Sequence, residues 1–556
     1  MSSSLLLLVW LLPVSLTLLA GQRYAGWIMV IAPLPALLAA ILVPPGTSLS
    51  LPWLLLGVEL GLDETGRVFL LFSGLLWLVA SLYGAGSKVA AGHTVRYRLF
   101  FLLAMTGNLG LIVAQDIVSF YLGFTLMGLS TYGLIVHAAT RQAQRAARRY
   151  LAWTIAGEMA LFVALVMLAM QHGGVLTFGE LQSSPPAGFV VLLLVIGFGI
   201  KMALPGLHLW LPQAYAVTPA AAVAVLSGAM IKAGLLGWLR FLPPGDGALV
   251  GWGQALLVVG VSGIFFGALI GLLQQTPRLL LGYSSISKMG VLTVGMGAAL
   301  VWPDAAPAVI GALLLYAAHH ALVKGALFLG LGLVERGGLR PWILTGLGFL
   351  ALVLAGAPLT SGALAKAVLK VSLPAEAQAL VSLLAVAAFA TTLLMARFLF
   401  LVWKQRNSDT SPCPLEMTSA WLLLVLVIAA FPFLASASGL FTADALPVIL
   451  GVLLSVVALL AAGRLPGISA IHSCRAATRQ LAVRTTRTRR HLVRLADHLS
   501  GILQSRWRNP YQSLQRSLKH RLTQRRQSGE QQHWPLTGSL WIGIGGLLLA
   551  AFISNG

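Results

Sequence analysis

The sequence predicts an all-α polytopic membrane protein with about 16 transmembrane helices, two inverted five-helix repeats and a long lateral amphipathic helix. Its composition is the first reason, because hydrophobic residues make up 58% of the 556 residues and charged residues only 9%. An average globular chain is about 25% charged. At about 20 apolar residues per span, this chain has enough for roughly 16 spans. The order of the apolar runs and the charges between them are the second and third reasons.

Apolar runs separated by short polar loops give the predicted spans in chain order. The spans are 5–20, 26–43, 67–84, 98–115, 117–137, 150–171, 188–210, 217–241, 250–274, 279–301, 307–333, 342–370, 376–403, 418–440, 444–462 and 534–554. The first run has no positive residue before it, so we expect a retained membrane helix and not a cleaved signal peptide.

The charges of the loops alternate along the chain. Loops after odd-numbered spans carry basic residues such as Arg145 and Arg336, whereas loops after even-numbered spans carry acidic residues such as Asp63 and Asp304. Loops rich in Lys and Arg remain in the cytoplasm. The alternation therefore supports the number of spans and predicts a multi-pass protein of a bacterial inner membrane with a periplasmic N-terminus.

Residues 464–533 interrupt the apolar pattern. They contain 15 Lys and Arg against Asp497 and Glu530, and apolar residues such as Leu492 and Leu495 recur at helical spacing. This pattern predicts a basic amphipathic helix on the cytoplasmic membrane face, where anionic lipid headgroups would be its partners. Nucleic-acid binding is the competing interpretation of a basic run. Because predicted spans on both sides hold the segment against the bilayer, we expect no nucleic-acid partner.

Two predicted spans are interrupted close to a lysine. Pro205 and Gly206 follow Lys201, and Pro358 precedes Lys366. Unwound backbone within a membrane is tolerated only where it lines a cavity, so the pairing predicts that helices 7 and 12 are broken at corresponding places of two inverted repeats. The expected parts are N-terminal transmembrane helices (1–97), a first repeat (98–241), a second repeat (250–403), C-terminal transmembrane helices (404–463), the lateral helix (464–533) and a final transmembrane helix (534–556).

Ionisable residues within the spans are the candidate functional residues, because charge in hydrocarbon is costly. The predicted proton or ion relay consists of Glu158, Lys201, Lys232, His319, His320, Lys324 and Lys366, with His208 and Lys288 as possible members. Buried lysine and histidine can gain or lose a proton near neutral pH. A row of such groups permits proton transfer from one to the next.

Several of these residues also have a structural interpretation. His208 could bond to backbone freed by the helix break, and Glu158 could pair with an arginine of the preceding loop. Lys288 could lie near a cytoplasmic helix end. We expect the nearby Lys370 to extend toward the membrane interface.

The two cysteines, Cys413 and Cys474, exclude a disulfide scaffold, a Cys-rich zinc site and a four-cysteine iron–sulfur cluster. The chain also has no recognisable site for a nucleotide, flavin or quinone. We therefore expect no catalytic residue, metal or cofactor in this chain. Any redox centre would belong to a partner, and whether the whole assembly is an enzyme stays open.

Four stretches resemble a known family. They are GFGIKMALPGLHLWLP around Lys201, YSSISKMG around Lys288, HALVKGALF around Lys324 and APLTSGALAK, which ends at Lys366. Over roughly residues 60–400 the chain resembles the antiporter-like membrane subunits of respiratory complex I (NADH:quinone oxidoreductase), Mrp antiporters and membrane-bound hydrogenases. Its layout, with a lateral helix before the last span, is most similar to the distal complex I subunit.

The resemblance implies inverted five-helix repeats, a central polar axis and proton translocation driven by other membrane subunits of a multi-subunit complex. It implies that Lys201 and Lys232 match the central lysines of the first repeat. His320 and Lys324 would match the connecting relay, and Lys366 would match the terminal lysine of the second repeat.

The chain departs from the family in the fifth span. The family usually has a Trp-Glu pair there, and its glutamate pairs with the lysine of span 7. Here FYLGFTLMG places Phe124 and Thr125 at those positions. Because threonine cannot ionise, Lys201 lacks the expected counter-ion unless Glu158 on the next span replaces it.

Three functions are compatible with these observations. The first is a proton- or cation-translocating subunit of a complex I-related assembly. The second is the membrane partner of an inorganic-carbon uptake system of the DAB type, in which ion flux would drive a carbonic-anhydrase-like protein. The third is a structural subunit whose channel has decayed. Neighbouring genes would separate the first two, and proton uptake measurements would test the third.

Overall fold

A computed structural model of the chain describes residues 2–22, 24–54, 56–87, 94–174, 176–181, 184–244, 247–405, 412–434 and 445–464. The chain divides into two units, Met1–Leu460 and Ala461–Gly556. The predicted lateral helix at 464–533 and the final span at 534–554 lie outside the described residues, apart from Arg464. The helices and strands below belong to the first unit.

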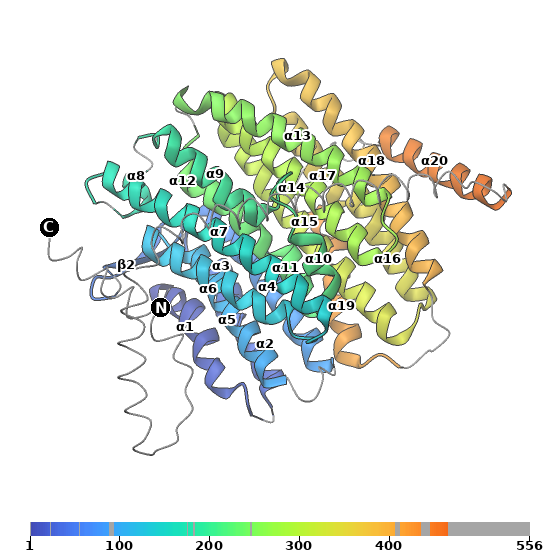
Figure 1. Cartoon of the computed structure of the whole chain (residues 1–556), viewed down its shortest axis with the longest axis horizontal. Helices are drawn as coiled ribbons and strands as arrows, with labels where there is room; N and C mark the ends of the chain where they lie inside the picture. The colour runs from blue at the N-terminus through green and yellow to red at the C-terminus, as the bar shows by residue number, and fades with distance from the viewer. Residues whose placement is uncertain are drawn as a thin grey trace, which may run out of the picture. The chain divides into compact units, whose positions relative to one another are not determined.

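The helices account for most of the described chain (Figure 1). In chain order they are α1 (Ser2–Ser15), α2 (Ala25–Ile31), α3 (Leu34–Leu42), α4 (Glu64–Gly86), α5 (Thr94–Val113), α6 (Ile117–Ile135), α7 (Arg141–Gln171), α8 (Phe178–Leu181), α9 (Gly188–Met202), α10 (Leu211–Val217), α11 (Ala220–Gly228), α12 (Ala233–Phe241), α13 (Val250–Leu272), α14 (Pro277–Val301), α15 (Ala306–Gly337), α16 (Pro341–Ala355), α17 (Ser361–Val371), α18 (Gln378–Lys404), α19 (Leu415–Leu434) and α20 (Ala445–Arg464).

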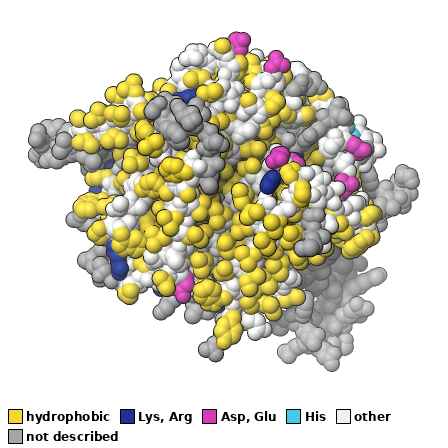
Figure 2. All heavy atoms as spheres, turned by 180° about the vertical axis from the view of Figure 1, so that it is seen from behind, with side chains coloured by type: hydrophobic (Ala, Val, Ile, Leu, Met, Phe, Trp, Pro, Cys, Tyr) yellow, Lys and Arg dark blue, Asp and Glu magenta, His cyan; other side chains and the backbone are white. Residues whose placement is uncertain are grey.

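The length and composition of these helices make the protein a multi-pass membrane protein. Within the described residues, 11 helical segments are long and apolar enough to cross a membrane. Four shorter apolar helices accompany them, at Ser3–Leu19, Gly188–Met202, Pro341–Ala355 and Ala445–Val457. Apolar side chains cover much of the face shown in Figure 2, and few charged groups lie among them. Such a surface is expected where helices face lipid.

The prediction of an all-α fold was wrong at one place, where the loop after the second predicted span contains a β-hairpin. Strands β1 (Thr47–Leu51) and β2 (Val58–Leu62) pair antiparallel, with Thr47 opposite Leu62. The Asp116 carboxylate accepts a hydrogen bond of 2.9 Å from the backbone N–H of Glu59. A search for long apolar runs does not detect strands this short, so the hairpin was missed.

The predicted start of the sixth span was also wrong. Helix α7 begins at Arg141, not at residue 150, and the Thr140 side chain caps it by accepting a hydrogen bond from the N–H of Ala143. The arginine-rich loop of the prediction therefore forms the first turns of this helix. Hydropathy locates the apolar part of a helix, but a polar extension into water carries no apolar signal.

Helix α9 breaks two residues after Lys201. Ala203 adopts a left-handed conformation with φ of 56°. The N–H of Ala203 donates to Ile200 O at 3.1 Å, and the next N–H along the chain donates to Gly199 O at 3.0 Å. These two bonds form a Schellman motif, which satisfies the last carbonyls of the helix. Pro205 follows and prevents the helix from continuing.

Helix α16 ends in the same way. Gly356 is left-handed with φ of 92°. Its N–H donates to Val353 O at 3.1 Å, and the N–H of Ala357 donates to Leu352 O at 3.0 Å. Pro358 then stands in the same place relative to the break as Pro205 does after α9. Both helices thus break at the proline-interrupted positions, and each resumes as a shorter helix, α10 or α17.

The helices that precede each broken helix pack closely at glycine. Helix α5 packs on α6, and α13 packs on α14 (Figure 1). A Cβ added at Gly107 would lie 2.6 Å from Gly123 O, and a Cβ at Gly260 would lie 2.8 Å from Gly290 O. Only glycine permits such an approach of two backbones. The two pairs therefore provide a close-packed support on which the broken helices rest.

An ion pair joins the beginning of α4 to the end of α12. The guanidinium of Arg240 donates to both carboxylate oxygens of Asp63, at 2.6 and 2.7 Å. Asp63 also caps α4 by accepting a hydrogen bond of 2.9 Å from the N–H of Gly66. Burial raises the pKa of Asp63, but the hydrogen bonds and the charge of Arg240 together lower it by more, so its pKa lies below the ordinary value of 3.8.

We expect Asp63→Asn to destabilise the protein by about 1–2 kcal/mol at pH 7, because asparagine keeps the helix cap but leaves the buried Arg240 without its counter-charge. This is below the usual cost of breaking a buried pair because the Asp63 side chain is 41% exposed. Thermal unfolding of the purified protein in detergent measures the loss. The exposed Asp304, changed to Asn, is the control and should have no effect.

The same pair predicts a pH dependence. Since the pKa of Asp63 is lower in the folded than in the unfolded state, its contribution is fully present above about pH 4 and is lost as the pH falls through the folded value. The difference in stability between the wild type and Asp63→Asn should thus be constant from about pH 5 to 8 and shrink below about pH 4. A difference that grew on acidification would contradict this assignment.

Candidate functional site

A small internal cavity lies between α6, α7 and α9. Glu158 of α7 and Lys201 of α9 both line it, and they are only 4% and 5% exposed. The cavity offers about 10 Å³ to the centre of a water molecule, which is about the room that one water needs. Its lining residues are Phe124, Tyr150, Thr154, Gly157, Glu158, Gly197, Ile200, Lys201 and Trp210.

The absence of a side chain at Gly128 makes room for the Glu158 carboxylate. A Cβ added at Gly128 would collide with Oε1 of Glu158. The Tyr150 hydroxyl donates to Gly128 O at 2.9 Å, and the Tyr150 ring packs edge-on against Trp210, with the ring centroids 5.2 Å apart. Trp210 in turn donates from Nε1 to Ile200 O at 2.8 Å. These contacts fix the wall of the cavity around the carboxylate.

Glu158 and Lys201 share the cavity without forming a close ion pair. Among the described residues, neither Glu158 Oε1 nor Lys201 Nζ has a hydrogen-bond partner. Their charges nevertheless act on each other. Lys201 Nζ lies 5.5 Å from the centre of the Phe124 ring, a distance at which a cation is attracted to the ring face. Thr125, the neighbour of Phe124, is not among the lining residues.

The alternative that Glu158 pairs with an arginine of the preceding loop was wrong. Those arginines lie on the same helix as Glu158, and Arg149 is the nearest of them in sequence. The nine residues between Arg149 and Glu158 correspond to about 13 Å along a helix, which is beyond the reach of the two side chains. The buried carboxylate of Glu158 therefore faces Lys201 and not the arginines.

His208 lies between α9 and α10, where the chain is unwound, and is 7% exposed. Its ring centroid is 4.8 Å from that of Phe266 and 6.4 Å from that of Tyr283. Neither of the two lysine-lined cavities includes His208. The structure thus places this histidine among aromatic rings of α13 and α14 and does not bring it to the other candidate residues.

Lys232 lies at a helix break that the sequence pattern did not predict. A short 3₁₀ segment, Met230–Lys232, separates α11 from α12. The fully buried Lys232 donates from Nζ to Ser227 O at 2.7 Å. No proline marks this break, which explains why the prediction treated residues 217–241 as one uninterrupted span.

His320 and Lys324 lie on one face of α15, as their spacing implies. Lys324 donates from Nζ to Leu281 O of α14 at 2.8 Å. His320 is fully buried, and neither of its ring nitrogens has a hydrogen-bond partner among the described residues. The charges of Lys232 and Lys324 both act on His320. The structure therefore brings these three residues into one electrostatically connected group.

His319 connects this group to the second broken helix. Its Nδ1 lies 3.0 Å from the hydroxyl oxygen of Ser361, the first residue of α17. The charges of Lys366 and Lys288 act on His319. Lys288, on α14, donates from Nζ to the hydroxyl of Thr391 on α18.

Lys366 closes the break between α16 and α17. Its Nζ donates to Ala355 O, at the end of α16. Gly356 leaves the space for this contact, since a Cβ there would lie 2.7 Å from Lys366 Nζ. An ammonium group at the C-terminal end of a helix is favoured by the helix dipole as well as by the hydrogen bond.

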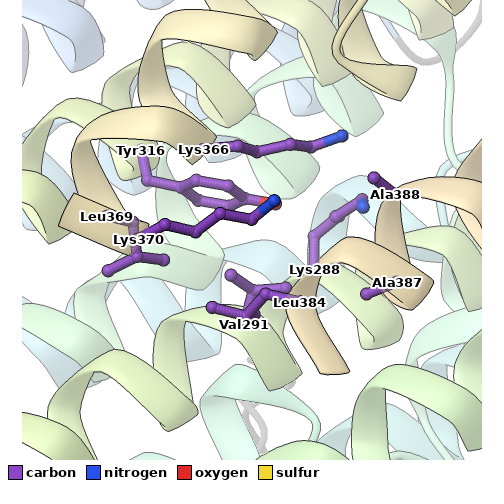
Figure 3. A pocket seen from close by; sticks show the side chains of 9 residues that line it. All are labelled: Lys288, Val291, Tyr316, Lys366, Leu369, Lys370, Leu384, Ala387 and Ala388. Carbon is purple, nitrogen blue, oxygen red and sulfur yellow. The ribbon is translucent and has the colours of Figure 1, made fainter. Parts of the chain in front are cut away.

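A second cavity adjoins Lys366 and has the same size as the first, about 10 Å³ for the centre of a water molecule. Figure 3 shows the side chains of Lys288, Lys366 and Lys370 extending toward the same region, next to the ring of Tyr316. The lining residues are Lys288, Val291, Tyr316, Lys366, Leu369, Lys370, Leu384, Ala387 and Ala388.

Two residues of this cavity were not predicted as site residues. Lys370 was expected to extend to the membrane interface, but it is half-buried and lines the cavity. Its spacing of four from Lys366 was the available signal, because residues four apart share a helix face. For Tyr316 the sequence offered no signal, because a tyrosine in an apolar helix is usually a packing residue.

Comparison with known proteins adds three similarities in sequence. The family described as NADH:quinone oxidoreductase/Mrp antiporter, transmembrane region, matches residues 114–394. Hydrogenase-4 component B of Escherichia coli is 29% identical over 290 residues, which are 50% of this chain and 43% of that protein. NADH-quinone oxidoreductase subunit N of Desulforudis audaxviator is 32% identical over 296 residues, which are 50% of this chain and 56% of that protein.

A putative antiporter subunit mnhA2 of Staphylococcus saprophyticus is 28% identical over 364 residues, which cover 60% of this chain and 45% of the relative. The chain thus spans about half the length of the curated relatives it matches.

Solved structures share the fold. The Mrp complex from a Dietzia species has a chain with a TM-score of 0.70 and 22% identity, over 86% of this chain and 60% of that chain. Respiratory complex I from Thermus thermophilus has a chain with a TM-score of 0.67 and 22% identity, over 80% of this chain and 99% of that chain.

We expect Gly356→Ala to destabilise the protein by about 1–2 kcal/mol, because alanine is strained at a positive φ and its methyl group would displace Lys366 from Ala355 O. Gly348→Ala is the matched control on the same helix, since a Cβ there meets no atom within 4 Å. It should be neutral or slightly stabilising. Thermal unfolding in detergent compares the two, and equal midpoints would contradict the role given to Gly356.

Proposed function

Since the chain belongs to the NADH:quinone oxidoreductase/Mrp antiporter family, as the match over residues 114–394 establishes, we propose that it translocates protons, or another cation, across the membrane. In this proposal it is the antiporter-like subunit of a complex I-related assembly of several membrane subunits. Its chain holds no redox site of its own, and partner subunits supply the driving reaction.

The observation that carries this proposal is a row of buried ionisable side chains that begins and ends at broken helices. Lys201 lies at the end of α9, and Lys366 closes the break after α16. Electrostatic interactions connect the histidines of α15 to lysines on both of their sides. In order, the proposed path contains Glu158, Lys201, Lys232, Lys324, His320, His319 and Lys366, with Lys288 beside its end.

The partners of the lysines suit proton transfer. Lys232, Lys324 and Lys366 donate to backbone carbonyls. A carbonyl keeps a hydrogen bond to lysine whether the amine is charged or neutral, whereas a carboxylate would hold the charged form. Two unit charges 4 Å apart interact by about 4 kcal/mol at an effective dielectric of 20. A proton that arrives at one group of the row therefore favours release from the next.

Glu158 takes the place of the missing glutamate of the fifth span in this proposal. It lines the same cavity as Lys201, whereas Thr125 does not. Gly128, on the helix that carries Thr125, provides the space for the displaced carboxylate. The counter-ion has in effect moved from α6 to α7 while facing the same lysine.

We also propose the finer architecture. Helices α5 to α12 and α13 to α18 would form the two inverted repeats, which the matching ends of α9 and α16 and the glycine contacts of the preceding helices support. The alternating loop charges favour a periplasmic N-terminus in a bacterial inner membrane. The basic residues 464–533 would lie along the cytoplasmic face, in contact with anionic lipid headgroups and neighbouring subunits.

The first test changes the two ends of the row. We expect Lys201→Ala and Lys366→Ala each to reduce proton uptake by about tenfold or more, because each removes a group that accepts and releases the proton. Uptake is measured with a pH-sensitive dye in vesicles that contain the whole assembly. The exposed Lys404, changed to Ala, is the control. Unchanged uptake in both variants would indicate a structural subunit with a decayed channel.

The second test moves the counter-ion. Glu158→Gln should reduce proton uptake several-fold, while the exposed Glu376→Gln should not, because only Glu158 faces Lys201. Adding Thr125→Glu to Glu158→Gln should restore part of the activity by returning a carboxylate to α6. If Glu158→Gln behaves like Glu376→Gln, the replacement of the span-5 glutamate is refuted.

A further inference from the structure

The two lysine-lined cavities differ in their balance of charge. In the first, the carboxylate of Glu158 faces the single lysine, Lys201. In the second, the described lining residues include Lys288, Lys366 and Lys370 and no Asp or Glu. Three ammonium groups therefore surround a space to which the protein itself contributes no negative charge.

Like charges close together in an apolar environment repel strongly. At an effective dielectric of 20, two unit charges 4 Å apart cost about 4 kcal/mol. The backbone and hydroxyl partners of Lys366 and Lys288, Ala355 O and Thr391 Oγ1, contribute dipoles and no net charge. A negative ion between the lysines would interact with all of them at once and remove most of this repulsion.

The size of the cavity restricts the ion. The space admits the centre of one water-sized sphere, about 10 Å³. A halide is a little larger than a water molecule and fits with a small outward movement of the lysines. Bicarbonate, phosphate or sulfate would need room for three or four oxygen atoms. The remaining lining, Val291, Leu369, Leu384, Ala387 and Ala388, is apolar and suits a weakly hydrated ion.

We infer that this cavity binds a single small monovalent anion, chloride, between the side chains of Lys288, Lys366 and Lys370. The phenol of Tyr316 lines the same space and supplies a fourth group that can donate a hydrogen bond to an anion. Lys370 is half-buried whereas Lys288 and Lys366 are buried, so the anion enters past Lys370.

This inference goes beyond the proposed function and does not depend on it. Chloride binding is a property of the folded chain that is measured without any transport. It gives the cationic end of the row a counter-ion from solution, in the position where the first cavity has a fixed carboxylate. The second lysine cluster can then hold its protons without a protein anion beside it.

The test is equilibrium binding of radioactive chloride to the purified full-length protein at pH 7, in sodium gluconate to keep the ionic strength constant. We expect saturable binding of one chloride per chain. Lys370→Gln should weaken it about tenfold, since it removes one of three charge-assisted contacts. Lys404→Gln, an exposed lysine on α18, should leave it unchanged. Lys370 is half-buried at the entrance, so its replacement should not prevent folding.

Competition distinguishes the ion. Unlabelled bromide should displace chloride at similar concentrations, while sulfate at equal ionic strength should not. Absence of saturable binding in a protein that elutes as a single folded species would overturn the inference. Binding that Lys370→Gln leaves unaltered would place the ion elsewhere and would also overturn it. Efficient displacement by sulfate would refute a cavity of the size described.

Discussion

The arrangement of this protein depends on one constraint: a polar group within apolar helices must find its partner in the protein itself. The buried lysines meet this constraint largely with backbone carbonyls. Lys232 bonds to a carbonyl beside a 3₁₀ segment, and Lys366 bonds to the carbonyl that ends α16. Helix breaks are therefore not defects of the bundle, because they expose the acceptors that make buried ammonium groups affordable.

The same constraint explains how much of the structure could be predicted from the sequence. The breaks after Lys201 and before Lys366 could be predicted, because proline removes a backbone donor and leaves a visible mark. The break at Lys232 could not, since its cause is packing and its residues are ordinary helix formers. The apolar runs located the helices, whereas polar extensions such as the start of α7 and the short hairpin had no such signal.

Prediction of the site had similar limits. Burial cost singled out the ionisable residues one by one, and the structure brings most of them together through interactions of α15 with its neighbours. It could not show that His208 lies apart among aromatic rings, or that Lys370 joins Lys366 and Lys288 at one cavity. Those facts depend on side-chain direction and on helices distant in sequence. The pairing of Glu158 with Lys201 required both, and Gly128 supplies the space for it.

The length of α7 sets the depth of Glu158. Its 31 residues span about 46 Å, well beyond a hydrocarbon layer of about 30 Å. The exposed arginines of its first turns, from Arg141 to Arg149, must remain in water or among headgroups. They act as a float that fixes the height of the helix, with the carboxylate about 13 Å below the last of them, close to the bilayer midplane. A vertical shift of α7 would therefore have to drag arginines into lipid, which holds the carboxylate level with its lysine.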